Sequence, residues 1–151
     1  IGDGNNVAHS LLLMAAKLGT TMVVGTPEGY RPAPSIMDRA RTIAAETGAT
    51  ILWTADPVEA AREADMIYTD TWTSMGQEDE AEQRRKVFPP YQVNYPLLQM
   101  APAHTIVMHC LPAHRGEEIT DSVADGPQSR LFPQAENRLH AQKAILVQLL
   151  R

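Results

Sequence analysis

The chain has 151 residues, of which 44% are hydrophobic and 21% charged, a composition that suits one soluble domain with a single core. A net charge of −5 argues against nucleic-acid and anionic-membrane partners, which require clustered Lys and Arg. A single cysteine, Cys110, excludes an internal disulfide and favours a reducing, cytoplasmic location, and no apolar stretch approaches the roughly 20 residues that cross a bilayer.

The first half of the chain alternates between predicted helices and strands. Ile1 leads directly into the turn Gly2-Asp3-Gly4, of a kind that follows a buried strand, so we expect most of that strand to be missing and the chain to be a fragment. Helical spacing from Asn6 to Leu18 ends at Gly19, a residue suited to a left-handed C-cap. The pattern then predicts a strand over 21–24, a helix over 35–47, a strand over 49–53, a short helix opened by Asp56-Pro57 and a strand over 65–69.

The second half begins with polar and proline-rich segments and ends in a long helix. A polar segment over 77–86 and a proline-rich stretch to Tyr95 precede a short helical segment over 97–100, a strand over 105–108 and, after a polar connection, an amphipathic helix over 135–150. Strands that alternate with helices predict a doubly wound, mostly parallel α/β sheet, Rossmann-like, with helices on both faces, in a single domain. Functional residues are then expected where the strands end.

The opening turn is the first candidate site. Gly2-x-Gly4 resembles a dinucleotide-binding fingerprint, but its third glycine would fall at Val7, so nucleotide binding is weakly supported. Asn5 is equally well explained as a helix cap. A carboxamide at a helix start, where backbone N–H groups are free, suits a carboxylate ligand, and this favours Asn6 as a substrate residue.

Asp70 to Gly76 is the second candidate. Asp70 emerges at the carboxyl end of a strand, where it either caps a turn or binds a ligand. Ser74, Met75 and Gly76 add a hydroxyl, backbone groups and a flexible glycine, a combination suited to hold an amino-acid head group and to move as a lid. Trp53 and Trp72 are interpreted as core or lid packing.

Cys110 and Arg138 complete the candidates, each with a structural alternative. Cys110 follows a strand between His109 and Leu111-Pro112, where a thiol can face a crevice or pack as a small apolar side chain. Neighbouring residues of an extended backbone point in opposite directions, so His109 and Cys110 are poorly placed to share a metal. No protease signature surrounds Cys110, and a lone arginine such as Arg138 is often a surface ion-pair partner.

Four segments together resemble the ornithine carbamoyltransferases. They stand in the order and spacing of that family along the whole chain: Gly2-Asp-Gly-Asn-Asn6, Asp70-Thr-Trp-Thr-Ser-Met-Gly76, His109-Cys-Leu-Pro112 and Phe132-Pro-Gln-Ala-Glu-Asn-Arg138. The resemblance implies that residues 1–151 form the ornithine-binding, C-terminal half of such an enzyme, which transfers the carbamoyl group of carbamoyl phosphate to the δ-amine of L-ornithine and yields citrulline and phosphate. It implies no cofactor and no metal.

The resemblance also assigns roles to individual residues. Asn6, Asp70, Ser74 and Met75 would bind ornithine, with Asp70 and Cys110 near its side-chain amine. Facing the carbamoyl group would be Cys110, Leu111 and Arg138, and the catalytic residues would be Asp70, Cys110 and Arg138.

Deprotonation of the amine is the chemical difficulty that this reaction poses. An alkyl amine titrates near pH 10.4, so presenting it as a free base at neutral pH costs roughly 4 kcal/mol. Asp70 alone would stabilise the charged amine. A second contributor is therefore needed, and the Cys110 thiolate, the substrate phosphate and desolvation by the lid all remain open.

The chain departs from the family in one respect, since the Ser-x-Arg-Thr motif of the carbamoyl phosphate half occurs nowhere in it. We therefore expect the chain to be inactive by itself, and its parent, in arginine biosynthesis, to be a trimer or a multiple of trimers. The final helix normally packs toward the other half, so Leu146, Leu149 and Leu150 are expected to be exposed. Other possibilities are a non-catalytic amino-acid or nucleotide binding module, and a carbamoyltransferase for putrescine or an acylated ornithine.

Overall fold

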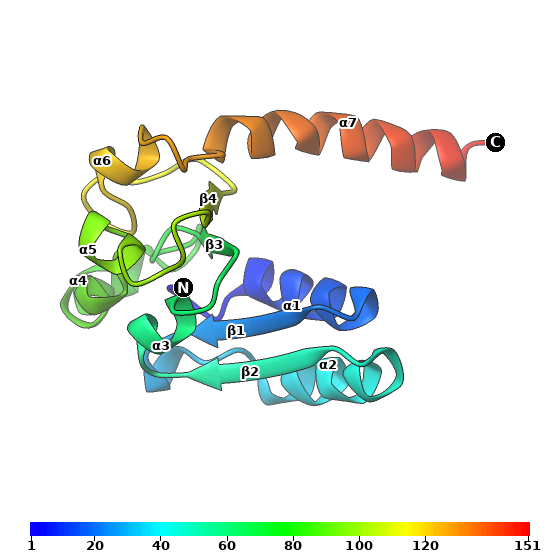
Figure 1. Ribbon diagram of the computed structural model, residues 1–151, viewed down its shortest axis with the longest axis horizontal. Coiled ribbons are helices and arrows are strands. Elements are labelled where there is room, and N and C mark those ends of the chain that lie inside the picture. Colours follow the sequence, from blue (N-terminus) through cyan, green and yellow to red (C-terminus); the bar gives the residue numbers. More distant parts are fainter.

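A computed structural model describes residues 1–151, and it confirms an α/β fold with parallel strands and helices on both sides (Figure 1). Strands β1 (Thr21–Gly25) and β2 (Thr50–Thr54) pair in parallel, and so do β3 (Met66–Thr69) and β4 (Ile106–His109). The first two residues lie between the pairs: the Gly2 amide donates to the Gly25 carbonyl at 3.0 Å, and the Ile1 amine donates to the Tyr68 carbonyl at 2.8 Å. The predicted sheet is therefore present as two strand pairs joined through Ile1 and Gly2.

The first three helices begin and end where their capping residues are. Helix α1 (Asn6–Leu18) is capped by the Asn5 side chain, which accepts from the Val7 and Ala8 amides, and ends at Gly19 with φ 70°. Helix α2 (Pro34–Thr47) ends at Gly48 in the same left-handed conformation. Helix α3 (Pro57–Ala61) is capped by Asp56, which accepts from the Val58 amide.

The connection between β3 and β4 consists of short elements. It contains the turns η2 (Glu78–Glu80) and η3 (Pro89–Tyr91) and the helices α4 (Ala81–Val87) and α5 (Tyr95–Leu98); a further turn, η1 (Glu28–Tyr30), follows β1. The predicted polar element over 77–86 is thus a turn followed by a helix. Helix α6 (Asp121–Ala124) was not predicted, because four residues are too few for a periodic pattern.

Helix α7 (Leu131–Leu149) starts four positions earlier than predicted. Pro133 lies in its first turn, where the missing N–H removes no helical hydrogen bond, so the proline does not delay the helix. The helix contacts β4 near its start and then extends away from the rest of the molecule (Figure 1). Every residue from Glu136 to Leu150 is exposed, which agrees with the expectation for Leu146, Leu149 and Leu150.

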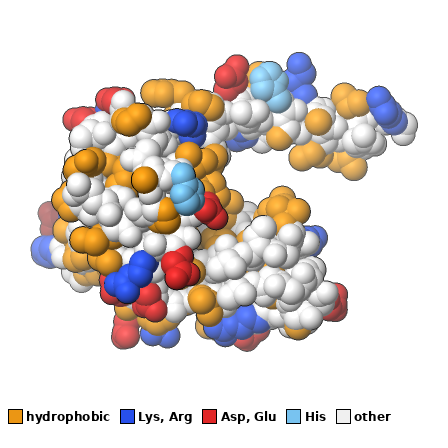
Figure 2. All heavy atoms as spheres, viewed as in Figure 1, with side chains coloured by type: hydrophobic (Ala, Val, Ile, Leu, Met, Phe, Trp, Pro, Cys, Tyr) orange, Lys and Arg blue, Asp and Glu red, His pale blue; other side chains and the backbone are white.

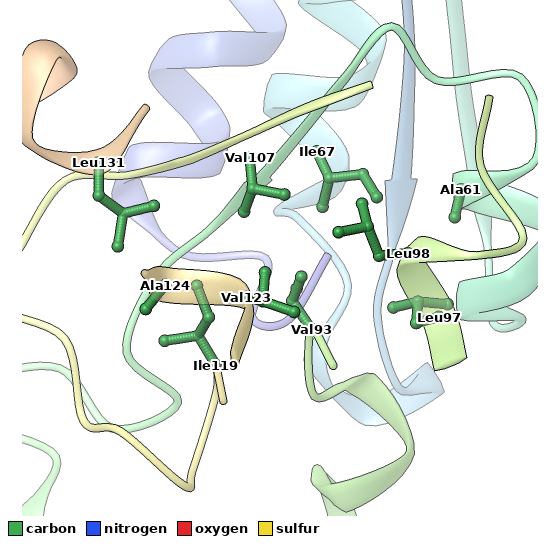
Figure 3. Close-up of a cluster of buried hydrophobic side chains, with 10 residues drawn as sticks. All are labelled: Ala61, Ile67, Val93, Leu97, Leu98, Val107, Ile119, Val123, Ala124 and Leu131. Carbon is green, nitrogen blue, oxygen red and sulfur yellow. The ribbon is translucent and has the colours of Figure 1, made fainter. Parts of the chain in front are cut away.

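Two apolar clusters form most of the core. One joins β3 and β4 to α5 and α6 (Figure 3), with Ile67, Val93, Val107 and Ile119 almost fully buried. The other lies between the β1–β2 pair and helices α1 and α2. A third, small cluster consists of Trp72, Phe88 and Tyr91, which confirms Trp72 as a packing residue. No helix combines the length and apolar character that crossing a membrane takes.

Candidate functional site

Loops from three parts of the chain meet at the Asp70 carboxylate. Asp70 follows β3 and Cys110 follows β4, and the pairing of Thr69 with His109 places the two residues opposite each other. The Cys110 thiol donates to Asp70 Oδ1, with 2.9 Å between sulfur and oxygen. From the start of α1, Asn5 Nδ2 donates to Asp70 Oδ2 at 2.8 Å. The predicted convergence of the strand-end loops is therefore present.

The Asp70 carboxylate and the loss of solvent keep the Cys110 thiol protonated. Burial, followed by the hydrogen bond to Asp70 and the charge of Asp70, raises the pKa of Cys110 to about 12. A nearby hydroxyl, that of Tyr68, opposes this rise. Near neutral pH the sulfur is therefore a thiol that donates a hydrogen bond and not a thiolate that accepts a proton.

Asn5 does more than the sequence indicated. Its side-chain oxygen caps α1, as predicted, while its nitrogen reaches Asp70. One carboxamide thus fixes both the helix start and the carboxylate. Asn6 lies in the first turn of α1 with its side chain exposed, and its carboxamide is available to a ligand.

A buried histidine holds the turn that contains Cys110 and Leu111. His109 and Glu118 are both fully buried. The Leu111 amide donates to His109 Nδ1 at 2.8 Å, so the ring proton lies on Nε2, which donates to Glu118 Oε1 at 3.0 Å. Leu111 has a φ of 56°, a region that side chains larger than glycine rarely adopt, and this hydrogen bond helps to keep it there. Glu118 lies in a polar connection without periodicity, so no sequence pattern points to it.

The same histidine bears on metal binding. Donor atoms of Asp70, His109 and Cys110 lie within 4.8 Å of one another. Both ring nitrogens of His109 are already engaged, one as acceptor and the other as donor. Only Asp70 and Cys110 could offer a metal a ligand atom here, which is fewer than the protein ligands of structural or catalytic zinc sites.

Ser74 and Met75 make no hydrogen bond to Asp70 in this structure. Met75 is 98% exposed, and Gly76 has a φ of 86°. The loop is held by hydrogen bonds within itself, from the Ser74 amide to Gln77 Oε1 and from the Gly76 amide to Glu78 Oε1. The segment is therefore an exposed loop at the edge of the site.

Arg138 lies on the second turn of α7, on the side that faces β4. It is exposed and lines an open cavity of about 480 Å³ together with Met108, Gln134 and Asn137. Its charge lowers the pKa of Tyr68, the residue two positions before Asp70, although burial raises that pKa more strongly. The cavity thus lies between α7 and β4, and Met108, which lines it, is two positions before Cys110.

A buried ion pair fixes the opening loop, and no local sequence pattern predicts this pair. The Arg84 guanidinium on α4 bonds to Asp3 Oδ2 and to the Trp72 carbonyl, each at 2.8 Å. The Arg84 and Asp3 side chains are 5% and 8% exposed. Burial raises the pKa of Asp3, and the contact with Arg84 opposes that rise. The pair connects the Gly2–Asn6 loop to the segment after Asp70.

The chain is similar to proteins of one family over nearly its whole length. The profile of the family described as "Aspartate/ornithine carbamoyltransferase, Asp/Orn binding domain" matches residues 1–149. Ornithine carbamoyltransferases of Gloeobacter violaceus and Thermococcus kodakarensis are each 59% identical, over 99% and 97% of this chain but only 48% and 46% of their own length. The structure of the Pyrococcus furiosus ornithine carbamoyltransferase superposes with a TM-score of 0.91 at 58% identity, over 96% of this chain and 46% of that one. The chain thus spans about half the length of these relatives.

Proposed function

The chain belongs to the aspartate/ornithine carbamoyltransferase family, and from this we propose that residues 1–151 are the ornithine-binding domain of an ornithine carbamoyltransferase. In the proposed reaction the δ-amine of L-ornithine attacks the carbonyl carbon of carbamoyl phosphate. The new C–N bond replaces the bond from carbon to the phosphate oxygen, and the amine loses a proton. Citrulline and phosphate are the products.

The Asp70 carboxylate is the observation that carries this proposal. It lies at the meeting point of three loops, and both of its oxygens accept hydrogen bonds, from Cys110 and from Asn5. A carboxylate with donors gathered around it is suited to bind a cationic amine, which takes the place of one of these donors. We assign Asn6, Asp70, Ser74 and Met75 to ornithine, and the last two require the exposed loop to close over the site.

The state of Cys110 narrows the choice of proton acceptor. A thiol whose pKa is raised to about 12 is protonated near neutral pH and is a poor base. Of the three possible proton acceptors, the Cys110 thiolate, the substrate phosphate and desolvation by the lid, Cys110 is therefore the least suitable. Substrate phosphate and desolvation by the closing loop are left. In our proposal Cys110 and Leu111 contact the carbamoyl group, and Arg138 stabilises the charge that develops on its oxygen.

The phosphate of the donor requires residues from outside this sequence. No Ser-x-Arg-Thr motif occurs in the 151 residues, so we propose that carbamoyl phosphate is bound mainly by a second domain and that residues 1–151 alone are inactive. A trimer or a multiple of trimers, a cytoplasmic location and a role in arginine biosynthesis belong to the same proposal.

Citrulline formation tests the proposal directly. Residues 1–151 alone should form no citrulline from ornithine and carbamoyl phosphate, and a mixture with the amino-terminal half of the Gloeobacter violaceus relative should form some. Titration calorimetry with L-ornithine, putrescine, N-acetylornithine and NAD identifies the ligand. Preference for putrescine or the acylated amino acid would redirect the proposal within the family, and tight NAD binding would overturn it.

The variant Asp70→Asn tests the role of the Asp70 carboxylate. It is made in a protein in which residues 1–151 are fused to the amino-terminal half of the Gloeobacter violaceus relative. Because Asp70 is assigned to the amine, we expect the KM for ornithine to rise at least about tenfold and the KM for carbamoyl phosphate to change much less. Asp65→Asn, an exposed carboxylate bonded to His104, is the control. Equal increases in KM for ornithine and for carbamoyl phosphate would contradict the assignment of Asp70 to the amine.

A further inference from the structure

Helix α7 is attached to the rest of the molecule through its first turns. Every residue from Glu136 to Leu150 is exposed, so the main attachment lies before Glu136. Leu131 is 2% exposed and belongs to the apolar cluster around β3 and β4. Directly before it, the Arg130 amide donates to the Val107 carbonyl at 2.8 Å. Packing and a backbone hydrogen bond therefore hold the start of the helix against β4.

One side-chain hydrogen bond adds a second attachment, to the neighbouring strand β3. Ile67 and Thr69 are almost fully buried, and because side chains alternate along a strand, Tyr68 projects from the opposite face. There Gln134 Nε2 donates to the Tyr68 hydroxyl oxygen at 3.0 Å. The other side-chain hydrogen bonds and ion pairs of α7 lie within the helix itself. The start of the helix is therefore held at two strands, by packing on β4 and by this bond to β3.

Two attachments fix the direction in which a helix face points, whereas one would leave the helix free to turn about it. Gln134 and Arg138 are four positions apart and therefore lie on the same face of α7. Both line the cavity of about 480 Å³, together with Met108 of β4. The Arg138 side chain makes no hydrogen bond or ion pair of its own. Its position is therefore set by the helix, and the bond made by Gln134 is the nearest fixed point on the same face.

Packing alone explains a glutamine poorly at this place. The second amide atom of Gln134, Oε1, is buried without a hydrogen-bond partner. An unpaired buried acceptor is unfavourable for folding, and a leucine of similar size would avoid it. The contribution of Gln134 thus lies in the bond that its nitrogen makes to Tyr68.

We propose that Tyr68 and Gln134 are positioning residues, whose hydrogen bond orients the first turns of α7 and thereby places Arg138 beside the carbamoyl group. The placement at the carbamoyl group rests on the proposed function, but the orientation of the helix does not. Neither Tyr68 nor Gln134 needs to contact a substrate.

A double-mutant cycle tests whether the two side chains act through one bond. Tyr68→Phe keeps the ring and removes the hydroxyl, and Gln134→Leu keeps the bulk and removes the donor. Amide hydrogen exchange over residues 135–138 is measured in residues 1–151 at low protein concentration. We expect each single variant, and equally the double variant, to exchange about three- to tenfold faster than the wild type. Tyr95→Phe and Gln142→Leu, at exposed positions, are the matched controls and should exchange like the wild type.

Rescue by a conservative variant separates loss of the bond from general damage to the helix. In Gln134→Glu a carboxylate oxygen can accept a hydrogen bond from the Tyr68 hydroxyl, so exchange should return to within about twofold of the wild-type rate. When Gln134→Glu is combined with Tyr68→Phe, the carboxylate has no hydroxyl to accept from. Exchange should then stay as fast as in Tyr68→Phe alone.

Carbamoyl transfer is measured in the protein in which residues 1–151 are fused to the amino-terminal half of the Gloeobacter violaceus relative. Because Asn6 and Asp70 stay in place, we expect Tyr68→Phe and Gln134→Leu to lower kcat about three- to tenfold and to change the KM for ornithine by less than about twofold. Gln134→Glu should restore kcat. A KM for ornithine that rises as much as kcat falls would overturn the placement of Arg138, since the disturbance would then reach the ornithine site.

Wild-type exchange in both single variants would overturn the proposal. So would a double variant that exchanges faster by the product of the two single effects, because the two residues would then act independently. If circular dichroism shows that Tyr68→Phe does not fold, the comparison of Gln134→Leu with Gln134→Glu carries the test.

The exchange measurements need neither ornithine nor turnover. A fusion protein that forms no citrulline would therefore count against the proposed function and leave the exchange test intact. Faster exchange together with wild-type kcat would overturn the placement of Arg138 at the carbamoyl group.

Discussion

At the scale of single residues, the Asp70 carboxylate determines the chemistry around it. It accepts from Cys110 and from Asn5, and the amide of Thr71 donates to the same oxygen as the thiol. These donors stabilise negative charge at the point where the proposed substrate brings a cation. In our proposal the Asp70 carboxylate binds the amine, and the neighbouring Cys110 sulfur is kept neutral.

Asp70→Asn should make Cys110 more reactive. Burial is the largest cause of the raised pKa and remains in the variant, but the hydrogen bond to the carboxylate and its negative charge, which also raise the pKa, are removed. The pKa of Cys110 therefore falls from about 12, and at a fixed pH below it the thiolate fraction rises. We expect alkylation by iodoacetamide to be about tenfold faster or more. An unchanged rate would show that burial alone controls the thiol, and Asp65→Asn again serves as the control.

At the scale of elements, the sequence predicted what local patterns encode and missed what distant contacts encode. Helix α1 matches its prediction because Asn5 and Gly19 mark its ends by capping. The strands agree to within one residue at each end, as expected for apolar runs bounded by turn residues. Arg84 and Glu118 were missed, since the partner of Arg84 is Asp3, 81 positions away, and the partner of Glu118 is a histidine that pattern reading assigned only to a strand end.

Some contacts of the candidate site could be predicted from the sequence and others could not. The proximity of Asp70 and Cys110 could be predicted, because parallel strands end at the same edge of a sheet. The contact between Asn5 and Asp70 does not follow from it, because the carboxamide already had a local explanation as a cap.

Gly4→Ala tests how closely the elements around the site are packed. A Cβ at Gly4 would lie 2.3 Å from the Pro32 nitrogen and 2.6 Å from the Tyr30 oxygen, both backbone atoms. Because backbone must shift to admit it, we expect the free energy of unfolding in urea to fall by about 3 kcal/mol. Gly29→Ala, where a Cβ meets nothing within 4 Å, should change it by less than about 0.5 kcal/mol. Equal stabilities would mean that the turn between β1 and α2 adapts without cost.

At the scale of the whole molecule, α7 is the element that the rest of the chain does not cover. Ile145, Leu146, Leu149 and Leu150 are each more than half exposed, and Figure 2 shows hydrophobic side chains along the helix where it extends beyond the other elements. Apolar side chains in such a row favour association with another apolar surface. We propose that in the full-length enzyme this surface is on the domain that binds carbamoyl phosphate.

Residues 1–151 alone should therefore self-associate. We expect the sedimentation coefficient to rise with protein concentration for the wild type and to stay near the monomer value for the double variant Leu146→Glu, Leu149→Glu, since charges on the helix oppose burial of its apolar side. Gln142→Glu adds a charge at a polar position and should still associate. Concentration-independent sedimentation of the wild type would contradict the prediction.

The division of the core into two clusters has a consequence for motion. One cluster holds β1, β2, α1 and α2, and the other holds β3, β4, α5 and α6, so each half is expected to exchange its amide hydrogens as a separate cooperative unit. Asn5 belongs to the first half, whereas Asp70 and Cys110 belong to the second. The bond from Asn5 Nδ2 to Asp70 Oδ2 therefore crosses the boundary between two units that can fluctuate independently, and its occupancy measures whether they are aligned. A ligand that contacts both units would slow amide exchange in both, even at residues far from the ligand itself.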